Sequence, residues 1–257
     1  MELRDLAIRI LSADTLSDKL YFPSELTDHN PGTPLFWKEP SRPPGMGFQK
    51  HSRKDKLPNF QEHGNPEKRA ICLHRFAGHE LLAVEIMAFA LLAFPEAPKH
   101  FRRGVANTLR EEQGHVILYM DRLKQMGVSF GDLPLYRHFW AYTPYISNPL
   151  SYLSLMSLTF EMANLDFAPL YGRSFALYGD EEAASLMHKI LEDEISHVSF
   201  GWQWLRKLKS DRDTPWEAWR KHVPDIVPPK RARGFQLFEE HRRRAGIPDE
   251  WIEKLSQ

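Results

Sequence analysis

Two stretches of the sequence carry the same pattern of acidic and imidazole side chains. Each stretch contains a lone glutamate and, at almost the same distance further on, a Glu-x-x-His motif. The residues are Glu80, Glu112 and His115 in the first stretch, and Glu161, Glu194 and His197 in the second. Among the twelve histidines, only these two have a glutamate three residues earlier, a spacing that makes neighbours on one helix face. The repeat therefore predicts two matching pairs of helices that present these groups to a common interior.

Helical periodicity covers the region around both motifs. Pro66 is suited to a helix start and Pro95 to a helix end, while Gly127 and Gly179 are typical helix stops. The expected helices span about 66–94, 104–126, 150–178 and 180–208, with a kink near Pro169 in the third. Their connections are short, long and short, which is the order of a ferritin-like bundle. We therefore predict an all-α fold: a four-helix bundle with one long crossover between its second and third helices.

The regions outside the expected bundle differ from it in composition. Residues 1–65 combine a short amphipathic helix with a proline-rich arm that cannot be regular helix. Residues 66–210 form the expected bundle, and residues 211–257 an extension with a closing helix near 234–245. We expect these three stretches to be the domains of the chain.

All six motif residues lie in the middle of apolar stripes, so their side chains should be buried. Burying four carboxylates without compensation would cost several kcal/mol for each ion. Two divalent cations would balance the four charges, and neutral imidazoles would complete the ligand shells. Mixed oxygen and imidazole ligation favours two iron ions, with manganese or a mixed Mn/Fe pair as the alternatives.

Other residues near the motifs have less direct predicted roles. Glu111 and Asp193 stand immediately before the ligand glutamates, where each could accept a hydrogen bond from a ligating histidine. Tyr119 is one turn beyond His115 and is a candidate oxidisable neighbour or proton donor, or, more commonly for such a residue, a simple core tyrosine. Glu85 lies five residues after Glu80, and Asp166 lies five residues after Glu161. Five residues correspond to about 140° around a helix, so the second acid of each pair points away from the ligand face. We therefore expect Glu85 and Asp166 to form structural ion pairs instead of binding metal.

Composition narrows the classes of partner. The 34 basic and 34 acidic residues balance, which does not favour nucleic-acid binding. A single cysteine, Cys72, excludes an internal disulfide and fits a reducing compartment. The start of the chain lacks the apolar core of a signal peptide, and the longest apolar run, 86–94, is too short to cross a bilayer. We expect a cytoplasmic protein with no membrane partner.

The order Glu, Glu-x-x-His, Glu, Glu-x-x-His resembles that of the ferritin-like superfamily. The segments His74–Glu80 (HRFAGHE) and Glu192–Gly201 (EDEISHVSFG) resemble an uncharacterised bacterial family of ferritin-like domains of unknown function, number 455. The resemblance covers about 58–208 and, more loosely, 234–255. It implies that the metal ligands are the six motif residues named above.

Two positions depart from relatives of that superfamily. The usual Glu-x-Arg-His form is replaced by Glu112-Gln113-Gly114-His115, so the intervening arginine is missing. Rubrerythrin-type peroxidases carry a further glutamate three residues after the ligand of the third helix, and Asn164 stands there instead. With no Cys-x-x-Cys iron site either, peroxidase chemistry of that kind is disfavoured.

The leading expectation for function is a di-iron, or Mn/Fe, oxidoreductase that activates dioxygen or peroxide to oxidise an unidentified substrate. No flavin or nicotinamide fingerprint is present, so electrons would come from a separate donor. The alternatives are a ferroxidase or metal-handling protein without an organic substrate, and a metal-stabilised scaffold. The pattern identifies no catalytic residue beyond the ligands, and it permits a homodimer without requiring one.

Overall fold

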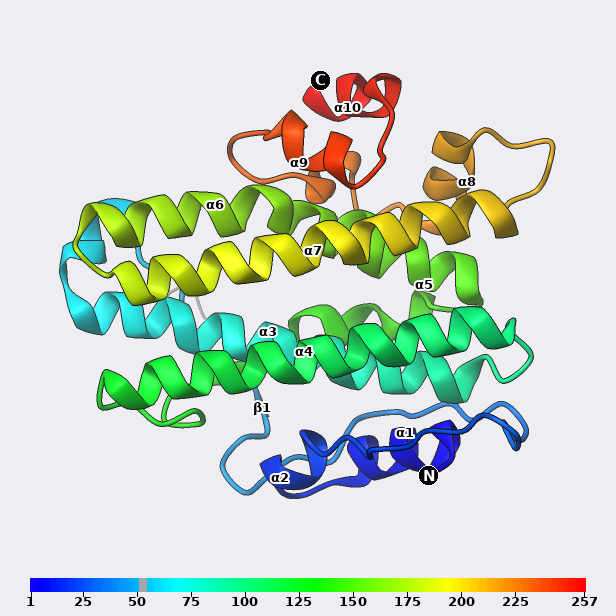
Figure 1. Cartoon of the computed structure of the whole chain (residues 1–257), viewed down its shortest axis with the longest axis horizontal. Helices are drawn as coiled ribbons and strands as arrows, with labels where there is room; N and C mark the ends of the chain where they lie inside the picture. The colour runs from blue at the N-terminus through cyan, green and yellow to red at the C-terminus, as the bar shows by residue number, and fades with distance from the viewer. Residues whose placement is uncertain (51–54) are drawn as a thin grey trace. The chain divides into compact units, whose positions relative to one another are not determined.

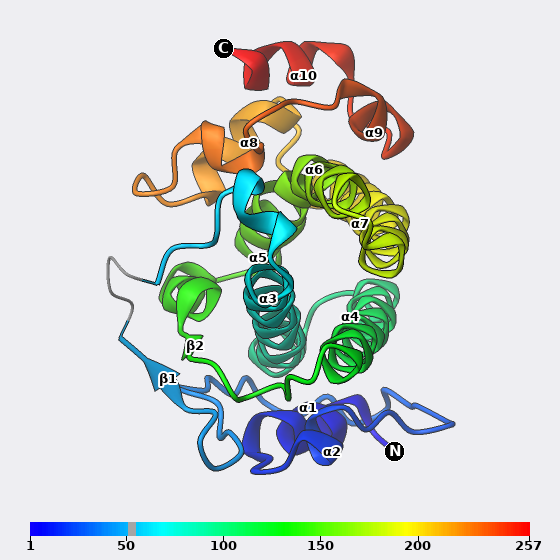
Figure 2. The same cartoon turned by 90° about the vertical axis from the view of Figure 1, so that its left-hand side faces the viewer.

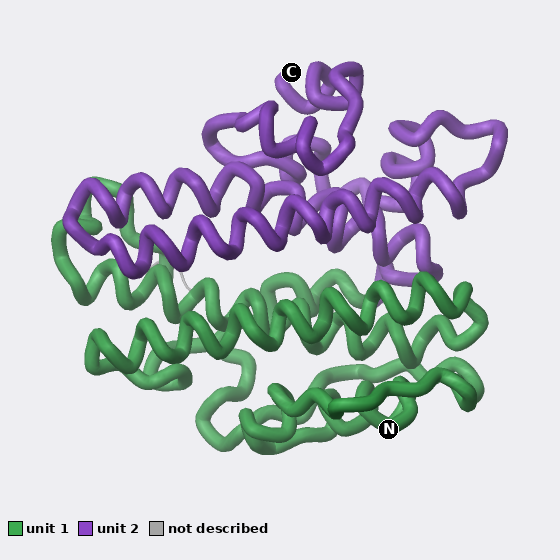
Figure 3. Tube along the Cα trace, in the orientation of Figure 1, with its two compact units in different colours: residues 1–143 green, residues 144–257 purple. Residues whose placement is uncertain are grey.

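The computed structural model describes residues 1–50 and 55–257 (Figure 1). The described residues are mostly helical, and their sheet content is one two-stranded parallel pair. The prediction of an all-α fold is confirmed. The chain divides into two compact units, Met1–Thr143 and Pro144–Gln257 (Figure 3). The association of the two units into one four-helix bundle stays a prediction.

The first unit is built around two long helices. α3 (Pro66–Ala93) and α4 (Lys99–Gln125) run in opposite directions across the short connection 94–98, as the sequence predicts for its first two helices. The shorter α1 and α2 lie along this pair (Figure 2). The remaining elements of the unit are α1 (Leu3–Ser12), α2 (Leu16–Lys19), β1 (Phe48–Gln49), η1 (Phe60–Gly64), β2 (Leu135–Tyr136) and the start of η2 (His138–Tyr145).

Local sequence explains where α3 begins and where α4 ends. The side chain of Asn65 accepts a hydrogen bond from the backbone N–H of Glu67, and Pro66 occupies the first turn, where no N–H is needed. After α4, Gly127 adopts a positive φ of 77°. This lets Val128 N–H bond to the carbonyl of Leu123 and satisfy the last turn.

In the residues that the structure describes, the proline-rich arm contains no α-helix, and its helical part is the short 3-10 segment η1. The arm contributes β1, which pairs in parallel with β2 of the long connection through Phe48–Leu135 and Gln49–Tyr136. This pairing could not be predicted from the sequence, because two-residue strands leave no periodic signal. The side chain of Leu135 also lies so close to Gly78 of α3 that a β-carbon there would be only 2.9 Å from it.

The second unit contains the other helical pair. α6 (Met162–Leu177) and α7 (Glu181–Leu208) are antiparallel neighbours joined at Gly179, whose φ is also 77°. The side chain of Asp180 caps α7 by accepting the N–H of Ala183. The remaining elements are α5 (Pro149–Leu155), η3 (Met156–Glu161), α8 (Pro215–His222), η4 (Pro229–Ala232), α9 (Glu239–Arg244) and α10 (Asp249–Ser256).

The third predicted helix differs from expectation. It is not one regular α-helix over 150–178, because η3 is a π-helical segment inserted between α5 and α6. α6 continues through Pro169, so the change in helical geometry lies well before that proline. The segment that departs from α-helical geometry ends at Glu161, one of the predicted metal ligands.

The C-terminal extension contains more helix than expected. The stretch before the expected closing helix contains α8, whose start is a capping box between Thr214 and Glu217. That Thr-x-x-Glu spacing was the available signal. The predicted closing helix near 234–245 is the shorter α9, and α10 follows it.

Buried ion pairs fix the N-terminal arm to α3. Lys19 Nζ lies 2.8 Å from one carboxylate oxygen of Glu85, and Arg42 Nη2 lies 2.5 Å from the other. The side chains of Lys19 and Glu85 are fully buried, and that of Arg42 is 3% exposed. The expected structural pairing of Glu85 is therefore confirmed. Lys19 comes from α2 and Arg42 from the proline-rich arm, so both cations belong to the N-terminal stretch 1–65.

α3 is also long and apolar enough to meet a simple test for a membrane span. However, 89% of its most apolar window is buried inside the protein. This is the behaviour of a core helix, which is consistent with a soluble protein.

Replacing Glu85 with Gln is expected to destabilise the protein by about 3–5 kcal/mol, because it leaves buried cations without their counter-charge. Chemical denaturation of the variant and the wild type measures the difference. The control is Glu250→Gln, which removes an exposed partner of Lys254 and should cost less than about 1 kcal/mol. Equal, small effects of the two substitutions would contradict the assignment.

Candidate metal centre

In the first unit, three predicted ligands converge between α3 and α4. One ligand atom from each of Glu80, Glu112 and His115 lies within 4.8 Å of the other two. Within the Glu-x-x-His turn, His115 Nδ1 is 3.1 Å from Glu112 Oε2. Each of the three residues is at most 5% exposed. Two carboxylates and an imidazole at this separation are able to hold one metal ion.

The apolar stripe predicted for α4 accounts for this burial. Val105, Leu109 and Val116 are fully buried on the same face as Glu112 and His115. The helix turns this face toward the core because burying its apolar side chains removes them from water. The two polar ligands are carried inward with them, which is why their position could be predicted.

In the second unit, the corresponding residues are buried in the same way. Glu161, Glu194 and His197 are each at most 4% exposed. Ligand atoms of Glu161 and His197 lie within 4.8 Å of each other, and His197 Nδ1 is 3.5 Å from Glu194 Oε2. The second unit therefore repeats the ligand types of the first on α7 and on the π-helical η3.

Asn164 has a structural role in the second unit that was not predicted from the sequence. Its side-chain N–H donates a 2.7 Å hydrogen bond to Glu194 Oε1. One oxygen of Glu194 is thereby held by an amide, while the other is nearer His197. Rubrerythrin-type peroxidases have a glutamate at the position of Asn164. A glutamate here could not donate this hydrogen bond, because a carboxylate only accepts, so the asparagine gives Glu194 a different neighbour.

The predicted neighbours of the ligands occupy different environments. Glu111 is exposed on α4, whereas Tyr119 is 1% exposed and packs against Phe76 with ring centres 6.1 Å apart. Asp193 is partly exposed and forms an ion pair with Lys189. A hydrogen bond from a ligating histidine to Glu111 or Asp193 stays a prediction.

Asp166 has the structural role that was expected of it. Arg242 of α9 donates to both of its oxygens, at 2.7 and 2.9 Å, and both side chains are fully buried. The backbone N–H groups of Gly234 and Phe238 donate to the same carboxylate. Its charge is therefore compensated by the C-terminal extension.

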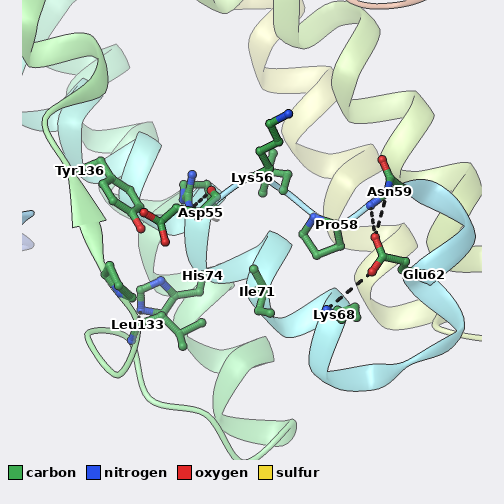
Figure 4. Close-up of a pocket in the computed structure, with 13 residues that line it drawn as sticks. Asp55, Lys56, Pro58, Asn59, Glu62, Lys68, Ile71, His74, Leu133 and Tyr136 are labelled. Carbon is green, nitrogen blue, oxygen red and sulfur yellow. Dashed lines mark hydrogen bonds and ion pairs between the residues drawn. The ribbon is translucent and has the colours of Figure 1, made fainter. Parts of the chain in front are cut away.

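A separate cavity of about 400 Å³ lies beside the N-terminal half of α3 (Figure 4). Its lining mixes cations and carboxylates, among them Arg75, Lys68 and Glu62, with apolar side chains such as Ile71. None of the predicted metal ligands lines it. The cavity was not predicted, because it depends on the packing of η1 and the long connection against α3.

His74 borders this cavity and fixes the long connection. Its Nε2 accepts hydrogen bonds from the backbone N–H groups of Gly131, at 2.9 Å, and Leu133, at 3.4 Å. The ring must therefore be unprotonated at Nε2. Burial, with a smaller effect of the Arg75 charge, lowers the pKa of His74 from 6.5 to about 4.

His74 is therefore expected to make stability depend on pH. Because its folded-state pKa is lowered, the stabilisation is fully present above pH 6.5 and is lost as the pH falls toward about 4. In that window the free energy of unfolding should fall by about 1.4 kcal/mol per pH unit more in the wild type than in His74→Gln, which cannot titrate. Denaturation across the window measures the two slopes. Equal slopes in the two proteins would contradict this role of His74.

No curated protein and no solved structure matches the chain significantly. The family model described as protein of unknown function (DUF455) matches residues 7–253, which is nearly the whole chain. The match spans the helices that carry both motifs and most of the C-terminal extension. The chain therefore belongs to the DUF455 family.

Proposed function

We propose that this protein is a ferritin-like di-metal carboxylate oxidoreductase. In this proposal the two helical pairs associate into one four-helix bundle and bind two iron ions, with manganese or Mn/Fe as alternatives. The ligands are Glu80, Glu112, His115, Glu161, Glu194 and His197. The protein would use dioxygen or peroxide to oxidise a substrate that is still unidentified, with electrons from a separate donor.

The observation that carries the proposal is the buried cluster of Glu80, Glu112 and His115 in the first unit. Their ligand atoms lie within 4.8 Å of one another, on two helices, and each residue is at most 5% exposed. A divalent cation placed among two carboxylates and an imidazole gains ligands of the type that iron and manganese accept. Zinc favours fewer carboxylates, and calcium and magnesium favour all-oxygen shells.

The ligand set of the second unit favours a proposal of two metal ions per chain over a proposal of one. This unit has the same set of two glutamates and one histidine, similarly buried, with the Glu-x-x-His pair again on one turn of a helix. A bundle that supplies a glutamate from each of two helices and a Glu-x-x-His from each of the other two is the ligand scheme of di-iron and di-manganese proteins. The proposal adds that the two sets face one interior.

The protein's own residues would have three tasks at such a site. The four glutamates would hold the cations and balance their positive charge. The apolar side chains around them exclude water. Asn164 fixes one oxygen of Glu194 and so limits how far that carboxylate can turn. When bound, two reduced iron ions would supply electrons for the reduction of dioxygen.

Metal binding is the first test. Purified wild-type protein titrated with Mn(II) and followed by electron paramagnetic resonance is expected to bind about two ions per chain. Glu112→Gln should weaken binding at least about tenfold, because it removes a charged ligand. Glu253→Gln, at an exposed position on α10, is the matched control and should bind like the wild type. A wild type that takes up neither Mn(II) nor Fe(II) would exclude the proposal.

Oxygen chemistry is the second test. Wild-type protein loaded with Fe(II) without oxygen should consume dioxygen when exposed to it and develop near-ultraviolet absorption, and Glu112→Gln should show neither change. An oxygen electrode and a stopped-flow spectrophotometer measure the two signals. Continued oxygen uptake with a supplied reductant indicates turnover, whereas uptake that ends with the added iron indicates ferroxidase activity. If metal binding raises the melting temperature but no oxygen is consumed, the protein is a metal-stabilised scaffold and not an oxidoreductase.

A further inference from the structure

The widened turn of η3 changes the hydrogen bonding of the helix that carries Glu161. In a π-helical turn the backbone cannot keep the regular pattern, and the affected carbonyls need other donors. The carbonyl of Ser154 accepts the Thr159 hydroxyl at 2.6 Å and the Trp219 indole N–H at 3.1 Å. The same indole nitrogen is 3.1 Å from Thr159 Oγ1. All of these groups are buried, so water does not compete for them.

Trp219 comes from the C-terminal extension and is held firmly in place. It lies on α8, is fully buried, and packs against Trp216 and Trp251 with ring centres 4.9 and 5.4 Å away. The indole N–H is therefore a fixed donor aimed at the start of the π-helical segment. A helix outside the predicted bundle thus contacts the turn that carries one of its proposed ligands.

Three further contacts surround the same segment. Gly201 of α7 faces Ser157 so closely that a β-carbon on the glycine would lie 2.3 Å from that of the serine. After the π segment, Arg242 of α9 donates to the carbonyl of Met162 at 3.3 Å. Arg231 also lies over the ring of Phe160, 5.5 Å from its centre. The segment is thus held by α7 on one side and by the C-terminal extension at several points.

We infer that Trp219 and Thr159 are positioning residues that keep the π-helical turn formed and thereby set the direction of Glu161. The inference rests on the proposed function for the metal role of Glu161. A π turn contains one more residue than an α turn, so conversion of η3 to α-helix would shift the helical register by one residue. One residue corresponds to about 100° around the helix. Glu161 would then leave the face on which it approaches His197.

The test uses substitutions that separate hydrogen bonding from packing. Trp219→Phe keeps an aromatic ring and removes the indole donor. Trp251→Phe is the matched control: that residue is buried in the same aromatic cluster, and its indole N–H has no hydrogen-bond partner in the described part of the chain. Thr159→Val keeps the shape of the side chain and removes the hydroxyl, and Thr159→Ser restores it.

Hydrogen exchange in the metal-free protein reports the turn directly. Trp219→Phe and Thr159→Val should speed exchange of the backbone amides of 156–161 by about tenfold, because each loses a buried hydrogen bond. Trp251→Phe and Thr159→Ser should leave these amides as in the wild type. In the Mn(II) titration, the first two variants should bind one of the two ions about 10–100-fold more weakly, while the other two bind normally.

The outcomes separate this inference from the proposed function. If exchange and Mn(II) affinity in Trp219→Phe and Thr159→Val match the wild type, the positioning role is wrong even when two ions bind. If Trp251→Phe changes both signals as much as Trp219→Phe, the effect is packing and the role is again wrong. If wild-type protein binds no metal while the predicted exchange changes occur, the hydrogen bonds do hold the turn. In that case it is the di-metal function that fails.

Discussion

Compensation of buried negative charge is the constraint on which the structure depends. A carboxylate inside a helical core is stable only when a cation or several hydrogen bonds replace the water that it has lost. Glu85 has its cations in Lys19 and Arg42, and Asp166 has Arg242 together with two backbone N–H groups. Both arrangements draw their cations from segments outside the paired long helices. The N-terminal stretch and the C-terminal extension therefore supply the positive charges that neutralise buried carboxylates of the long helices.

These ion pairs extend the internal repeat beyond the predicted ligands. Glu85 follows Glu80 by five residues, and Asp166 follows Glu161 by the same interval. Each unit thus has two buried acids on one helix, separated by about 140° around its axis. The second acid of each pair has its cation from the N-terminal arm or the C-terminal extension. The first acid of each pair, Glu80 or Glu161, lies beside a histidine of a Glu-x-x-His motif. The proposed compensation for its negative charge is a metal ion.

Much of this arrangement follows from local rules and was predictable. Asn65, Pro66 and Gly127 mark helix ends through capping and backbone geometry, which act within a few residues. The spacing of Glu112 and His115 in an apolar stripe determined their burial. In contrast, the partners of Glu85 and Asp166 could not be named from the sequence, since they lie 43 to 76 residues away in the chain. The exposed position of Glu111 likewise depended on how α4 packs.

The sequence by itself determined the helical class, the long helices and which of their faces carry buried acids and imidazoles, because hydrophobic periodicity and capping are short-range effects. Only the tertiary structure decided the geometry of η3, the hydrogen bond from Asn164 to Glu194 and the contact of Trp219 with Ser154. A π turn gives up regular backbone hydrogen bonds, so it persists where distant groups supply replacements. One replacement donor, Thr159, lies within the segment, but the other, Trp219, lies on a helix 65 residues beyond Ser154 and outside the reach of any local pattern.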